Sequence, residues 1–312
     1  MGSVAAQRPD QKSHRQSVPR PALVRVGALL LAVLVVAGCA GTRRVSSYQY
    51  DWNIFFESVF RPSPMIVNGI WLTVSIAIVA QIIGVVLGVF AALGRMAKSL
   101  PFKLVANFYI WLFRGTPLLV QISFIYFGLG VTKLYAWPTL DILGVSIPGA
   151  IQAGIFALGV NEGAYMAEIV RAGIISIDLG QMEAAKSLGM TYALGMRRIV
   201  LPQAARVIVP PLGNEFNNML KNTSLLVAIA VTELYVTFSY LNGSGPTSFH
   251  PFELFLAAAV WYLVLTTIWT VIQAWIESKL GKGTGRQEQI GLWDRLTGFR
   301  LGASSAGLGQ AH

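Results

Sequence analysis

The chain has 312 residues, of which 54% are hydrophobic and 12% are charged, whereas a soluble domain averages about 25% charged residues. Apolar residues form long uncharged runs, such as 70–93 and 254–276, and each run reaches the length of about 20 residues that a bilayer core requires. The formal charge of +10 falls between these runs, which argues against a nucleic-acid partner, and the single cysteine excludes an intrachain disulfide. An integral membrane protein is therefore predicted.

Six apolar segments, taken in chain order, are candidate transmembrane helices. They are residues 23–41, 65–93, 112–131, 149–170, 207–236 and 252–276. The first is the weakest, because Arg25 interrupts it and leaves only 26–42 uncharged. The pattern predicts an all-α integral membrane protein with six transmembrane helices, five core helices and one N-terminal helix.

The first segment has two interpretations. It is either an uncleaved anchor helix or a lipoprotein signal, because a basic stretch and a short apolar core precede Val-Ala-Gly-Cys, in which Cys39 would be lipidated after cleavage. Val36 stands where leucine is usual, which favours the anchor. Both interpretations leave residues 43–64 outside the membrane, so the rest of the predicted topology does not depend on the choice.

The orientation follows from the distribution of lysine and arginine. With the N-terminus inside, the outer segments keep only Arg43, Arg44, Arg61 and Lys133, and most other bases fall in the inner segments. Because cytoplasmic loops collect basic residues, both termini are predicted to be cytoplasmic. The chain then divides into a cytoplasmic tail with the N-terminal helix (1–44), an extracytoplasmic linker (45–64), a transmembrane domain (65–280) and a second cytoplasmic tail (281–312).

The long inner loop, residues 178–202, has the pattern of two short helices joined by a glycine. Residues 181–188 are strong helix formers, and Gly189 supplies a left-handed C-cap. Thr191 is placed to cap a second helix that runs to about Val200, and Pro202 is expected to end it before the fifth span. These residues predict a helix–glycine–helix elbow along the inner membrane surface.

The outer face of this elbow is expected to combine apolar and charged side chains. They are Met182, Ala185, Leu188 and Met190 beside Glu183, Lys186 and Arg197. Such a face suits docking into a groove of another protein, and it equally suits a helix pair that rests on the lipid headgroups. Physical reasoning alone does not choose between the two.

The spacing of the loop residues carries a family resemblance. Glu183-Ala184-Ala185, followed by Gly189 and by Ile199-x-Leu201-Pro202, resembles the EAA signature of binding-protein-dependent ABC importer permeases. Further segments resemble the polar amino acid (histidine/glutamine/arginine-type) branch of that family. They are residues 113–121, 164–171, 201–204 and 220–225, and the resemblance covers about 64–277.

The resemblance implies a type I ABC importer permease bundle in the bacterial cytoplasmic membrane. Its partners would be a pair of cytosolic ABC ATPase subunits, an extracytoplasmic amino-acid-binding protein and a second permease subunit, in a homodimer or a heterodimer. The residues implied in coupling to the ATPase are Glu183, Ala184, Ala185, Gly189, Ile199, Leu201 and Pro202. The chain itself lacks a P-loop, so ATP hydrolysis is assigned to the partner, and no cofactor or metal is expected.

Polar residues inside the predicted spans are expensive in a bilayer and are candidates for a solute path. Those assigned to the path are Asn161, Glu162, Tyr165, Asn214, Asn217, Asn218 and Lys221. The alternative is that these groups only hydrogen-bond neighbouring helices. Glu168 and Arg171, three residues apart, are expected to pair, and Arg114 is expected to be an interfacial anchor.

Two other functions compete with solute import. A membrane-embedded enzyme would use the buried carboxylates, but the sequence offers no metal-ligand cluster or nucleophile set. A non-transporting sensor or scaffold would keep the elbow only as a docking site. ATPase activity that responds to a binding protein without solute uptake would favour the scaffold.

Overall fold

A computed structural model describes residues 48–142 and 144–280 of the chain. The chain divides into Met1–Gln49 and Tyr50–His312, and the account below concerns the second unit. The first predicted span with Cys39 and the tail 281–312 lie outside the described residues.

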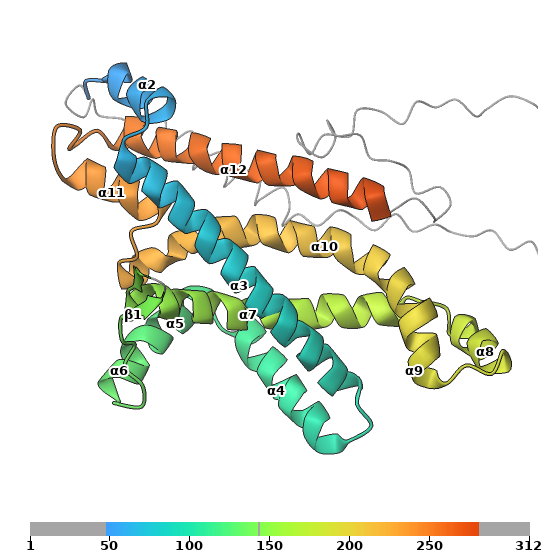
Figure 1. The fold of residues 1–312 in the computed structure, drawn as a ribbon. Helices are drawn as coiled ribbons and strands as arrows, with labels where there is room; N and C mark the ends of the chain where they lie inside the picture. Colours follow the sequence, from blue (N-terminus) through green and yellow to red (C-terminus); the bar gives the residue numbers. More distant parts are fainter. Residues whose placement is uncertain (1–47, 143, 281–312) are drawn as a thin grey trace, which may run out of the picture. The chain divides into compact units, whose positions relative to one another are not determined.

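The described part of the chain is almost entirely helical (Figure 1). In chain order its elements are α2 (Trp52–Phe60), α3 (Pro64–Met96), α4 (Leu100–Gly115), α5 (Leu118–Ser123), the π-helix η1 (Phe124–Gly128), α6 (Leu129–Val131), β1 (Leu140–Ile142), β2 (Val145–Ile147), α7 (Gly149–Ile175), α8 (Leu179–Ser187), α9 (Tyr192–Gly195), the π-helix η2 (Met196–Val200), α10 (Leu201–Asn222), the 3₁₀-helix η3 (Thr223–Ile229), α11 (Leu234–Gly243) and α12 (Pro251–Leu280).

Two helices are long and apolar enough to cross a membrane alone, α3 and α12. They confirm the helices predicted at 65–93 and 252–276. Helix α3 begins where the Ser63 hydroxyl accepts a hydrogen bond from the Ile66 N–H, with Pro64 in the first turn. Helix α7 contains the predicted segment 149–170 and continues to Ile175, but its Gly, Gln, Asn and Glu residues make it too polar to be identified as a span by composition.

The single helix predicted at 112–131 is wrong. Helix α4 ends at Gly115, and a second helical segment, Leu118–Val131, leaves it at an angle of 106°. Thr116 is extended, with φ −120° and ψ 147°, because the ring of Pro117 disfavours a helical residue before it. The break therefore lies at the sequence Gly-Thr-Pro, inside the segment that was predicted to be one continuous helix.

The single helix predicted at 207–236 is also wrong. The helical segment Tyr192–Ile229 is followed by α11 at an angle of 47°. Ala230 adopts a left-handed conformation with φ 56°, and the Glu233 side chain then caps α11 by accepting from the Val236 N–H. If each bent pair counts as one span, four spans can be identified by length and composition among the described residues.

Besides most of α4, which precedes the span predicted at 112–131, two further elements were not predicted. Residues 45–64, expected to be a linker, contain the helix α2, whose N-terminus is capped by the Asp51 side chain. Before α7 the chain forms a small antiparallel hairpin in which Leu140 pairs with Ile147 and Gly144 supplies a positive φ of 82°. Figure 1 shows α2 and α11 at the end of the bundle opposite α8 and α9.

The most extensive helix contact among the described elements joins α3 and α7 and depends on paired glycines. Gly84 and Gly88 lie four residues apart on α3, and Gly159 and Gly163 have the same spacing on α7. A Cβ at Gly84 would lie 2.5 Å from Cγ of Glu162, so the two backbones approach only because these side chains are absent. Small residues at this spacing are typical of packed transmembrane helices.

Candidate functional site

The inner loop forms the predicted helix–glycine–helix elbow. The Asp178 side chain caps α8 by accepting from the Gly180 N–H at 2.7 Å. Gly189 follows with φ +76°, a conformation that favours glycine, and Thr191 then accepts from the Leu194 N–H. The predicted C-cap and N-cap are therefore confirmed.

The predicted stop at Pro202 is wrong. The chain stays helical from Tyr192 through Ile229, and Pro202 lies in the first turn of α10. The turn before it is a π turn, in which the Leu201 N–H donates to the Met196 carbonyl five residues back. This wider turn accommodates the proline ring, which would clash in a regular α-helix.

Part of the predicted outer face of the elbow points inward. Ala185 is only 1% exposed, and a Cβ at Gly195 would lie 3.3 Å from its methyl group and 3.0 Å from the Met182 sulfur. Glu183 and Lys186 are exposed, Leu188 is 77% exposed, and Met190 is half-buried. The outward surface of the elbow thus combines charged side chains with large exposed residues, Leu179, Leu188 and Tyr192.

The inward side of the elbow packs on the ends of α3 and α7. Its apolar cluster contains Ala92 from α3, Val170 and Ile174 from α7, and Val200 and Ala204 from the elbow and α10, with Met182 and Met196 packed against it. Among the other signature residues, Ala184, Leu201 and Pro202 are exposed and Ile199 is half-buried. A displacement of the elbow therefore acts directly on α3 and α7.

Glu162 lies buried between α3 and α7, with 4% of its surface exposed. Its Oε1 accepts a hydrogen bond of 3.1 Å from Nε2 of Gln81 on α3. Glu215 of α10 lies close enough for its charge to interact with that of Glu162. The Glu162 carboxylate and the Gln81 amide thus meet where α3 and α7 pack together, and Gln81 was not among the predicted site residues.

Asn161 holds the break between α4 and α5. Its Nδ2 donates to the Phe113 carbonyl at 3.1 Å and to Oε1 of Gln121 at 2.9 Å. Gln121 in turn donates to the carbonyls of Phe113 and Thr116, at 2.8 and 3.0 Å. These bonds satisfy backbone groups that the interrupted helix leaves free, which is the structural role that the alternative interpretation expected.

The polar face predicted on α10 is divided. Asn214 accepts from Nε2 of Gln273 at 3.2 Å, and Asn217 donates to the Thr270 hydroxyl at 3.3 Å, so both face α12. Asn214, Asn218 and Lys221 are exposed, and Nδ2 of Asn218 donates to Glu215 of the same helix at 3.5 Å. Asn214 and Asn217 thus join α10 to α12, whereas Asn218 and Lys221 lie on the exposed part of α10.

Tyr165 lies beside an arginine-rich cluster around Glu168. The Arg114 guanidinium lies 5.3 Å from the centre of the Tyr165 ring and 3.2 Å from the Glu168 carboxylate. Arg171 pairs with Glu168 at 3.1 Å, which confirms the predicted pair, and Arg95 of α3 contacts the same carboxylate. Arg114, expected to be an interfacial anchor, is thus part of a side-chain cluster that joins α3, α4 and α7.

Comparison with known proteins is consistent with this arrangement. The family described as binding-protein-dependent transport system inner membrane component matches residues 84–282. The arginine transport system permease protein ArgU of Corynebacterium glutamicum is 39% identical over 267 residues, 83% of this chain and 82% of that protein. The arginine transport system permease protein ArtQ of Bacillus subtilis is 35% identical over 228 residues, 73% of this chain and 98% of that protein.

A solved structure shares the fold. It is described as a crystal structure of an amino acid ABC transporter with histidines, and one of its chains is 38% identical with a TM-score of 0.63. The similarity covers 74% of this chain and 100% of the other. The chain belongs to the binding-protein-dependent transport system inner membrane component family and is a transport subunit rather than an enzyme.

Proposed function

We propose that this permease imports polar amino acids across the bacterial cytoplasmic membrane and that its elbow couples import to a pair of cytosolic ABC ATPase subunits. The observation that carries the proposal is the elbow itself. It exposes Glu183, Lys186 and Leu188 outward while its inner side packs on α3 and α7. A helix pair that only rested on headgroups would not need the packed connection to both helices.

The coupling follows from this packing. When the ATPase subunits close, the elbow moves with them. The apolar cluster that contains Ala92, Val170 and Ile174 then transmits this movement to α3 and α7, because a closely packed interior is hardly compressible. A second permease subunit, identical or different, completes the pore, and an extracytoplasmic binding protein delivers the solute.

In the proposed topology both termini are cytoplasmic, and the N-terminal helix adds a sixth span. In a variant with Cys39 replaced, single cysteines at Ser146 and Ser244 should react with an impermeant thiol reagent added to intact cells. Cysteines at Ser187, in the elbow, and at Ser304, in the C-terminal tail, should react only after permeabilisation. Labelling of position 187 from outside would contradict the proposed orientation.

We place the solute path near Glu162 and the exposed residues Tyr165, Asn218 and Lys221. Asn161, Asn214 and Asn217 already bond neighbouring helices or the α4–α5 break, so they support the path rather than face it. A zwitterion that crosses the bilayer must exchange its water for such groups. Relatives named for arginine transport support a cationic amino acid among the substrates.

Glu162→Gln should raise the half-saturating concentration for a cationic amino acid about tenfold, because a charged hydrogen bond contributes roughly 1.5–3 kcal/mol. Basal ATP hydrolysis should stay at the wild-type rate because the elbow is unchanged. The measurement is uptake of labelled arginine and glutamine by proteoliposomes that hold the whole complex.

The control is Glu57→Gln, which removes an exposed carboxylate on α2 and should leave both amino acids unaffected. Unchanged arginine uptake in Glu162→Gln would remove Glu162 from the path. ATP hydrolysis that responds to the binding protein without any uptake by the wild type would favour a sensor or scaffold over a permease.

A further inference from the structure

Helix α2 is attached to the bundle by one face. Ile54 and Ser58, four residues apart on that face, are buried, and Ile54 packs in an apolar cluster with residues of α11 and α12. The indole nitrogen of Trp261 on α12 donates to the Ser58 carbonyl at 3.1 Å. The fully buried carboxylate of Glu253, also on α12, accepts from the Asp51 N–H at 2.8 Å. These contacts fix the orientation of α2 on α12.

The opposite face of α2 carries three exposed aromatic residues. Trp52, Phe56 and Phe60 follow one another at intervals of four residues, so they lie along one side of the helix and form what we call the aromatic stripe. They are 47%, 52% and 73% exposed. The Phe56 and Phe60 rings stack with their centres 6.2 Å apart, and Trp52 contacts the ring of Phe252 on α12 with centres 6.0 Å apart. The aromatic stripe is therefore an ordered apolar surface that the described part of the chain leaves open.

A polar edge runs beside the aromatic stripe. Asn53 and Glu57, also four residues apart, are exposed and lie one residue further round the helix. Helix α2 thus has protein behind it, aromatic rings in front and polar groups along one side. This pattern is typical of a helix that lies in a membrane surface, with its rings toward lipid and its polar edge toward water.

The position of α2 in the chain places it close to a membrane surface. Only residues 61–63 separate it from α3, which is long and apolar enough to cross the membrane. Figure 1 shows α2 beside the first turns of α12, the other helix of this kind. The nine residues of α2 extend about 14 Å, well short of the bilayer core of about 30 Å, so α2 cannot cross it.

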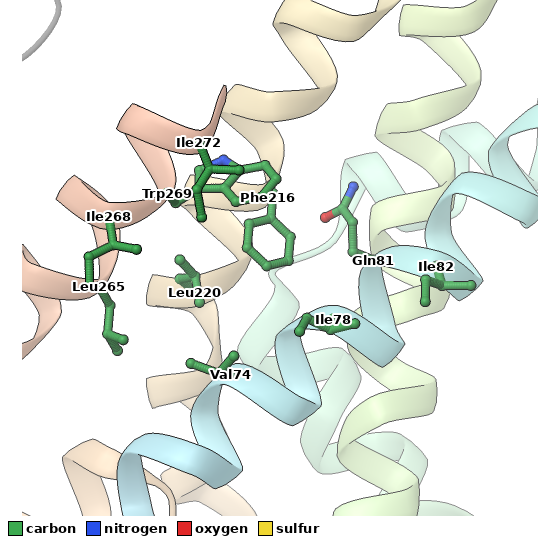
Figure 2. Close-up of a pocket in the computed structure, with 10 residues that line it drawn as sticks. All are labelled: Val74, Ile78, Gln81, Ile82, Phe216, Leu220, Leu265, Ile268, Trp269 and Ile272. Carbon is green, nitrogen blue, oxygen red and sulfur yellow. The ribbon is translucent and has the colours of Figure 1, made fainter. Parts of the chain in front are cut away.

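The aromatic stripe continues into the apolar surface of α12. Phe252, which contacts Trp52, shares one face of α12 with Leu256 and Leu263, and all three are exposed. Further along α12, Ile268 and Ile272 border an apolar groove that α12 forms with α3 and α10 (Figure 2). The rings therefore lie at one end of an extended apolar surface, which is where aromatic side chains gather in membrane proteins.

We infer that α2 lies in the membrane surface and that its aromatic stripe binds the lipid bilayer, among the headgroups and the adjoining acyl chains. The leaflet is the one at which α3 begins, which is the outer leaflet in the proposed topology. Asn53 and Glu57 face the water above the headgroups. Because Glu253 and Trp261 hold α2 on α12, the lipid contact of α2 sets the depth of α12 in the bilayer.

Other occupants match the aromatic stripe less well. A second transmembrane helix, including the span predicted at 23–41, packs closely where small residues let two backbones approach, and the stripe offers only large rings. A soluble binding protein could use the rings as anchors. It would not cover the apolar face of α12 into which the stripe continues. The bilayer covers both surfaces together.

The test measures the membrane depth of neighbouring positions by electron paramagnetic resonance. Phe56→Cys and Glu57→Cys, each with Cys39→Ser, carry a nitroxide in the permease–ATPase complex, held in nanodiscs of phosphatidylethanolamine and phosphatidylglycerol. Oxygen concentrates in lipid and a nickel chelate in water, so their collision rates report the depth. Position 56 should lie about 5–10 Å into the boundary of headgroups and acyl chains. Position 57, the matched control, should be accessible to nickel. Phe60→Cys and Asn53→Cys form a second pair with the same expectation.

Three results would overturn the inference. Equal nickel accessibility at positions 56 and 57 would place the aromatic stripe in water. Shielding of position 56 from both oxygen and nickel would assign the stripe to a second subunit or to the N-terminal segment. Immobilisation of the label at position 56 by the loaded binding protein would identify a docking surface for that protein. Because the measurement involves no transport, it does not depend on which solute the permease carries.

Discussion

Gly88→Val should prevent the bundle from forming its native packing. A Cβ at Gly88 would lie 2.2 Å from Cβ of Met166 and 3.0 Å from the backbone nitrogen of Ala167, both on α7. A side-chain rotation cannot relieve a contact with a Cβ and a backbone atom, so α3 and α7 must move apart. We expect a loss of about 3 kcal/mol or more, at the upper end of overpacking effects. The measurement is thermal unfolding of the detergent-purified protein, together with its elution profile in size-exclusion chromatography.

The matched control is Gly130→Ala in the short helix α6, where nothing lies within 4 Å of an added Cβ. This variant should unfold at or slightly above the wild-type temperature, because alanine stabilises a helix by roughly 1 kcal/mol relative to glycine. A wild-type melting temperature for Gly88→Val would contradict the close approach of the two helices.

Gly189→Val should abolish the stimulation of ATP hydrolysis by the loaded binding protein while the permease still inserts into the membrane. Gly189 has φ +76°, a conformation that a β-branched residue adopts only with strain, so the substitution changes the angle between α8 and α9. Nothing lies within 4 Å of the position, so the effect comes from the backbone rather than from packing. The assay is the ratio of stimulated to basal ATP hydrolysis in proteoliposomes.

Gly245→Val is the matched control, because Gly245 also has a positive φ, +80°, and open surroundings, but it lies between α11 and α12, away from the elbow. It carries the same backbone strain and should leave coupling intact. Glu183→Lys, which reverses an exposed charge on α8, should uncouple the complex as Gly189→Val does. Normal stimulation in both elbow variants would exclude docking through this surface.

The elbow illustrates what local sequence patterns can predict. Gly189 and Thr191 act through backbone dihedral angles and hydrogen bonds within a few residues of themselves, so their roles were predictable from the sequence. Asp178 caps α8 in the same local way but was not predicted. The direction in which Ala185 points could not be read in this way. It depends on Gly195 and Met182, which meet Ala185 only after the loop has folded back on itself.

The breaks in the helices show the limit of reading apolar runs. Pro117 ends the extended break within the predicted segment 112–131, whereas Pro202 does not end its helix because a π turn precedes it. Hydropathy indicates whether a segment favours an apolar environment or water. Whether the helix is continuous depends instead on individual backbone hydrogen bonds. The membrane environment of 112–131 and 207–236 was therefore predictable, and their geometry was not.

The sequence alone determined that the chain is a membrane protein, that its inner loop is an elbow, and that its spacing resembles an importer permease, because hydropathy, capping and motif spacing are local properties. Tertiary structure decided which polar residues face one another. Glu162 was singled out by its position in an apolar segment, but Gln81, eighty-one residues earlier in the chain, reaches it only because glycines let α3 and α7 approach. Contacts between distant segments depend on the packing of whole helices, and that packing is absent from any short stretch of sequence.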